Sequence, residues 1–237
     1  MNKAALRIVI VIVFMQGLHG CTRQQPEYGR ENLLSLPAGT KRQVWAVAPV
    51  LNLSGQREVD SLLQADLLYQ QLQQVRGITA IPVNRVAEVY ASMRIDRVDS
   101  PEQAQIVCEL LGCDALLVGT VTAFDPYNPP KFGGSLQLFT AADTAMQAGV
   151  DPRDLMRMAA PPEDAPMPQV RQAEVRQAVG MFDAANGSVR DEVMFYADGR
   201  NDPMGPMGPK EYLASMDRYC GFAYHTLIEQ LISQPRR

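Results

Sequence analysis

Along the first half of the chain, short apolar segments typical of buried strands alternate with longer segments typical of amphipathic helices. Residues 43–51 are aliphatic and β-branched with Pro49 near the end, which predicts a buried strand whose last residues leave the sheet. Apolar residues recur at steps of three and four over 58–75, which predicts a helix that ends before Gly77. The apolar stripe of this helix is Leu62, Ala65, Leu68, Leu72 and Val75. The glutamines expected to face water are Gln70, Gln71, Gln73 and Gln74.

A second strand, a pair of helices and a third strand follow. Residues 78–83 predict a short strand, and Asn84 is expected to cap a helix over 85–93. Residues 114–123 are apolar enough for a central strand. The order strand, helix, strand, two helices, strand predicts an α/β domain with parallel pairing.

The helix before the third strand has clear signals at both ends. Ser100, Pro101 and Gln103 form a capping box with proline at the first helical position. Gly112 stands where a left-handed residue ends a helix. The expected apolar stripe is Ala104, Val107, Cys108 and Leu111. We therefore expect this helix to pack on the sheet.

The second half predicts antiparallel strands and a final helix. Residues 134–140 read as a strand, while 177–183 and 188–197 read as a hairpin turning at Asn186-Gly187. A helix after Pro209 has the stripe Tyr212, Met216, Tyr219, Ala223, Leu227 and Leu231. The predicted fold class is α/β: a three-layer-like mixed sheet with flanking helices.

Composition and charge narrow the class of protein. The 237 residues are 46% hydrophobic and 20% charged, which is typical of a folded domain. Net charge is −4, and removing Lys3 and Arg7 with the leader leaves 20 basic against 26 acidic residues, or −6. A general nucleic-acid-binding surface is therefore not expected.

The chain begins like an exported protein. Lys3 and Arg7 precede the apolar block 8–15, which predicts a signal peptide over residues 1–20. The block is too short for a transmembrane helix. Gly20 and Cys21, with Leu18 before them, resemble the lipobox of bacterial lipoproteins.

That resemblance implies cleavage between Gly20 and Cys21 and acylation of Cys21, which becomes the membrane anchor. The alternative is an ordinary secretory leader with a chance cysteine. Thr22 follows the cysteine where many inner-membrane lipoproteins have Asp, so the resemblance favours an outer-membrane lipoprotein facing the periplasm. Residues 21–42 are rich in proline, glycine and polar side chains and predict a flexible tether, followed by one domain over 43–237.

Three segments carry a resemblance within the domain. They are 46–55 (AVAPVLNLSG), 111–121 (LGCDALLVGTV) and 182–189 (FDAANGSV). In this order they resemble the domain shared by the amino-terminal part of TolB, the curli-secretion lipoprotein CsgG and the penicillin-binding-protein activator LpoB. The resemblance implies a TolB N-terminal-domain-like fold. Val50 departs from it, because that family has Phe there.

Residues 141–172 are an insertion relative to that pattern, rich in proline and methionine. We expect a surface loop. The alternative is a partner-binding segment in which the methionines provide adaptable contacts.

Candidate chemistry is sparse. Once the leader is removed, His225 is the one histidine, and we expect it at the surface or its boundary beside Glu229. A lone histidine lacks the clustered ligands of a zinc site and the nucleophile of a triad, so no catalytic residues, metal or cofactor are predicted. Cys108 and Cys220 fall on apolar stripes, and Cys108 with Cys113 is the best disulfide candidate because export permits oxidation.

These observations lead to one main functional hypothesis and two alternatives. The main one is a non-catalytic, lipid-anchored envelope protein that binds a protein partner, which the LpoB resemblance would make a cell-wall synthase or another envelope complex. The first alternative is a structural subunit of a CsgG-like outer-membrane secretion assembly. The second is an envelope enzyme whose chemistry the motifs do not reveal.

Overall fold

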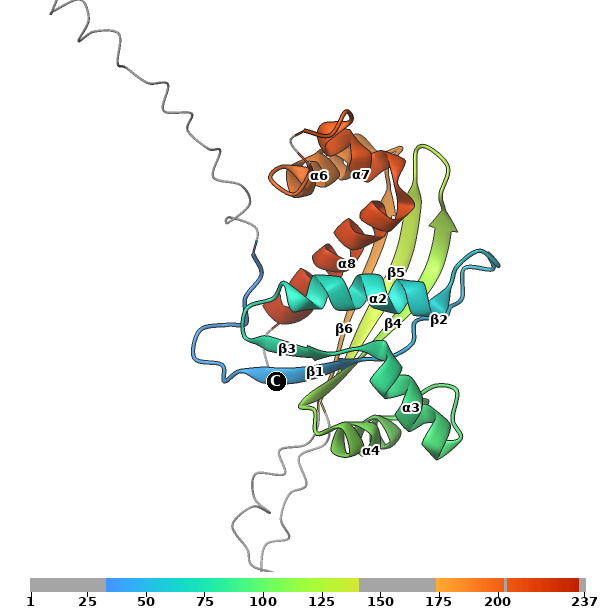
Figure 1. Cartoon of the computed structure of the whole chain (residues 1–237), viewed down its shortest axis with the longest axis vertical. Coiled ribbons are helices and arrows are strands. Elements are labelled where there is room, and N and C mark those ends of the chain that lie inside the picture. The colour runs from blue at the N-terminus through green and yellow to red at the C-terminus, as the bar shows by residue number, and fades with distance from the viewer. Residues whose placement is uncertain (1–32, 141–173, 203, 235–237) are drawn as a thin grey trace, which may run out of the picture.

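The computed structural model describes residues 33–140, 174–202 and 204–234, and in them a mixed sheet carries helices on both faces (Figure 1). The strands are β1 Gln43–Val47, β2 Leu51–Asn52, β3 Ile78–Ile81, β4 Ala115–Asp125, β5 Lys131–Thr140 and β6 Val175–Asp183. The helices are α2 Ser61–Gln73, α3 Val83–Met93, α4 Pro101–Leu111, α6 Gly187–Ala197, η2 Gly208–Lys210, α7 Glu211–Ala214 and α8 Met216–Ser233. The predicted leader, Cys21 and the insertion at 141–172 lie outside the described residues.

The sheet has six strands and both kinds of pairing. The order is β3-β1-β4-β5-β6, and β2 pairs with β4 beyond the end of β1. Strands β3, β1, β2 and β4 are parallel, whereas β4, β5 and β6 are antiparallel. The predicted mixed α/β class is confirmed. Pro49 lies in the break between β1 and β2, as expected of a residue that cannot donate to the ladder.

Alternation along the central strands produces two cores. Trp45 and Val47 face α2 and α8, while Ala46 and Ala48 face α3 and α4. All four side chains are buried because β1 is covered on both faces. Figure 1 shows α6 and α7 at one end of α8, beyond the part of the sheet that α3 and α4 cover.

The buried face of helix α2 differs from the predicted one. Leu62 is 52% exposed, whereas Gln64 and Gln71 are buried. Each glutamine side chain accepts a hydrogen bond from a buried tyrosine hydroxyl, Tyr224 to Gln64 at 2.9 Å and Tyr196 to Gln71 at 2.8 Å. The prediction that Gln71 faces water is therefore wrong, because these two tyrosines need acceptors inside the core.

The predicted cap of α4 is confirmed. The Ser100 hydroxyl accepts from the Gln103 backbone N–H at 3.3 Å, and Gly112 is left-handed with φ of 65°. Helix α3 begins two residues earlier than expected, because Pro82 and not Asn84 is its N-terminal cap residue.

The predicted hairpin at Asn186-Gly187 is wrong. Residues 188–197 belong to α6, and the Asn186 side chain accepts from the Ser188 N–H at 3.0 Å as a helix cap. Asparagine favours both turns and helix caps, and the buried positions Val193, Tyr196 and Ala197 follow helical spacing. A helix therefore covers the core where a further strand was expected.

Candidate functional site

The packed part of the chain begins before residue 43, where the sequence placed the end of the tether. Leu36 N–H donates to Arg76 C=O at 3.0 Å, and Arg76 N–H donates to Leu34 C=O at 2.8 Å. This is a parallel bridge between Ser35 and Arg76. Leu34 and Leu36 pack against the core shared by α2 and α8. Residues 33–38 are thus fixed to the domain.

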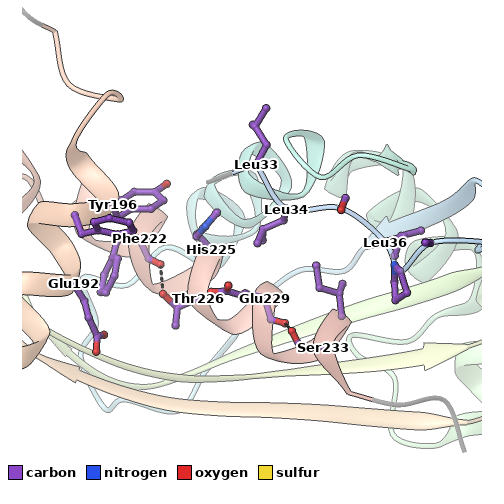
Figure 2. A pocket seen from close by; sticks show the side chains of 15 residues that line it. Leu33, Leu34, Leu36, Glu192, Tyr196, Phe222, His225, Thr226, Glu229 and Ser233 are labelled. Atoms are coloured by element: carbon purple, nitrogen blue, oxygen red, sulfur yellow. Dashed lines mark hydrogen bonds between the residues drawn. The ribbon is translucent and has the colours of Figure 1, made fainter. Parts of the chain in front are cut away.

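This segment forms one wall of a groove in the described chain. The cavity is about 720 Å³ and lies between residues 33–38, α6 and α8. Figure 2 shows the 33–38 segment running alongside α8, with side chains of α6 closing one end. The groove thus joins the end of the predicted tether to the C-terminal helix.

His225 lies in the floor of the groove. It is buried at 8% exposure and its ring centroid is 4.9 Å from that of Tyr196. Burial, with a smaller effect of the Arg200 charge, lowers the pKa of His225 from 6.5 to about 4. The guanidinium of Arg200 itself lies over the Tyr196 ring at 4.3 Å. The expectation of a surface or boundary histidine is wrong, because His225 packs against α6.

The rim of the groove combines exposed apolar groups with negative charge. Phe195 is 66% exposed and Leu33 is 37% exposed, both on the rim. Two exposed carboxylates, Glu192 of α6 and Glu229 of α8, line the same groove (Figure 2). Its lining, as far as the structure describes the chain, includes no lysine or arginine. The Phe195 side chain is in contact with water and would be shielded from it only by a bound molecule.

The predicted cysteine pair is close together at the other end of the molecule. Cys108 of α4 and Cys113 just before β4 are buried, and both thiols are free in the structure. Donation of a hydrogen bond to Cys113, and then burial, raise the pKa of the Cys108 thiol. Cys220 is buried in the α8 core, as expected of a small core residue. The disulfide stays a prediction.

The part of the chain that the structure describes has no candidate metal site. There, no three His, Cys, Asp or Glu side chains lie together as a metal site requires.

Within residues 33–140, 174–202 and 204–234, no helix is both long and apolar enough to span a bilayer.

The groove was missed from the sequence because its parts are far apart in the chain. Residues 33–38 read as tether, and Phe195 was expected in a strand. The leucines at 33, 34 and 36 are the signal that was available, because so many apolar residues are unusual in a flexible tether.

Comparisons with known proteins give similarity in structure only. No family model matches the sequence, and no curated protein matches it. The LpoB C-terminal domain from Salmonella enterica is similar at 12% identity and a TM-score of 0.39, over 62% of this chain and 87% of that one. Lipoprotein GNA1162 from Neisseria meningitidis is similar at 18% identity and a TM-score of 0.32, over 41% of this chain and 69% of that one. The PelC dodecamer from Paraburkholderia phytofirmans is similar at 11% identity and a TM-score of 0.33, over 85% of this chain and 95% of that one. At such identities and TM-scores no function is carried over to this chain.

Proposed function

We propose that this protein is a non-catalytic, lipid-anchored component of the bacterial cell envelope, facing the periplasm, that binds a protein partner through the groove beside α8. The observation that carries the proposal is the groove itself, with the exposed Phe195 on its rim. Exposed aromatic side chains in a hollow are typical anchors of protein interfaces. Membrane attachment rests on a different observation, the lipobox at Leu18 to Cys21.

The position of the groove agrees with a short tether. Twelve residue steps separate Cys21 from Leu33, the first described residue of the groove wall. A fully extended chain covers roughly 3.4 Å per residue, so this wall lies within about 40 Å of an anchor at Cys21. The partner therefore either sits at the membrane or reaches close to it.

Anchoring is tested by replacing Cys21 with serine in the full chain. We expect the wild-type protein in the membrane fraction and the variant in the soluble periplasmic fraction, because acylation requires the thiol. A variant that stays with the membrane would show that lipid on Cys21 is not the anchor.

Partner binding is tested by placing a photoreactive amino acid at Phe195 in the lipidated protein in cells. The matched control is Tyr127, an aromatic residue that is 77% exposed in the β4–β5 loop, away from the groove. We expect one discrete adduct from position 195 and none from 127, and the purified adduct partner must then bind the purified protein. Equal adducts from both positions, or none from 195, would contradict the proposal.

A further inference from the structure

The groove has features that specify the chemistry of its occupant. We propose that it binds an extended, cationic segment of the partner protein that pairs with the backbone at Ser35, places apolar side chains against Phe195 and places lysine or arginine beside Glu192 and Glu229. This inference rests on the proposed function and adds the kind of segment that is bound.

The first feature is a free backbone edge. Leu34 and Leu36 direct their hydrogen bonds to Arg76, on one side of the segment. In a parallel bridge the N–H and C=O of the middle residue point to the opposite side. Ser35 is exposed and lines the groove, and within the described chain its N–H and C=O take part in no hydrogen bond. An added strand satisfies such an edge, as in β-augmentation.

The second feature is the apolar lining. Phe222 and Ile232 of α8 are buried beneath the groove, and Phe195 and Leu33 stand at its rim. An extended segment alternates its side chains, so every second residue can face α8 while the others face the rim. The extended part of the wall, residues 33–36, matches roughly 13 Å of extended chain, and the chain turns at Pro37, whose carbonyl accepts from Thr40 N–H.

The third feature is charge. Glu192 and Glu229 stand on two different helices and line the same hollow, and no described lining residue is a lysine or arginine. An occupant with acidic side chains meets repulsion here, whereas a basic one is attracted. Both carboxylates are exposed, so they contribute mainly to selection between segments and to the rate of association.

The test uses two synthetic nine-residue peptides as probes, one alternating valine with lysine and the other alternating valine with glutamate. Binding to the purified full chain in nonionic detergent is followed by fluorescence anisotropy. We expect the lysine peptide to bind at least about tenfold more tightly, and the double variant Glu192→Lys, Glu229→Lys to reverse that order. A lysine peptide that binds both proteins equally would overturn the charge assignment.

Edge pairing is tested with the lysine peptide methylated on alternate backbone nitrogens, which removes donors and keeps side chains. We expect affinity to fall about tenfold or more, whereas unchanged affinity would overturn pairing at Ser35. Failure here is distinguishable from failure of the proposed function. If the photoreactive group at Phe195 captures a partner but the peptides do not discriminate, the groove binds proteins of another chemistry.

Discussion

Stability should depend on pH through His225. Its pKa is about 4 in the folded protein against 6.5 as the ordinary value, so between these limits the unfolded chain binds a proton that the folded protein does not. Stability is therefore complete above pH 6.5 and falls as the pH drops toward 4. A difference of this size corresponds to a loss of about 3 kcal/mol in the free energy of unfolding.

The assay is urea unfolding of the wild type and His225→Gln at pH 4, 5, 6 and 7. Other groups titrate alike in both proteins, so the difference between them isolates His225. We expect the variant to lose about 3 kcal/mol less than the wild type between pH 7 and pH 4. Removing the positive charge with Arg200→Gln should raise the histidine pKa only slightly, because burial is the larger cause of its lowering, while Glu192 and Glu229 stay in place. Parallel pH profiles for the wild type and His225→Gln would refute the reasoning.

Two further predictions concern the sheet and the cysteines. Gly180→Ala should cost about 1–3 kcal/mol in urea unfolding, since a Cβ there would lie 2.7 Å from the Phe182 ring, whereas Gly187→Ala, whose nearest heavy atom would be 3.8 Å away, should be near neutral. Equal effects would show that packing at Gly180 is not tight. Protein isolated from the periplasm should carry a Cys108–Cys113 disulfide, detected as a peptide pair that loses two hydrogens, and reduction should cost roughly 2 kcal/mol. Free thiols throughout would contradict that pairing.

The fold was predictable where local signals agreed. The cap at Ser100, the left-handed Gly112 and the apolar third strand each had one physical meaning, and each is present. Asn186-Gly187 is compatible with either a hairpin turn or a helix cap. The packing of Tyr196 against Phe222 of α8 favours the helix cap. Such a choice depends on a tertiary contact that sequence spacing does not contain.

The candidate site was less predictable for the same reason. Gln71 reads as a solvent-facing residue because the tyrosine that bonds it is 125 positions away. His225 reads as a boundary residue until α6 is known to be a helix that packs Tyr196 against it. The groove exists only once residues 33–38, α6 and α8 come together.

The central claim is that the groove beside α8 binds the partner, and the most direct measurement is the dissociation constant of the purified partner for two matched variants. Phe195→Ala removes the exposed ring at the rim, and Tyr127→Ala removes an exposed ring elsewhere. Truncating an interface anchor costs about 1–2 kcal/mol or more, so we predict at least about tenfold weaker binding for Phe195→Ala and unchanged binding for Tyr127→Ala. Unchanged binding of a folded Phe195→Ala protein would contradict the claim.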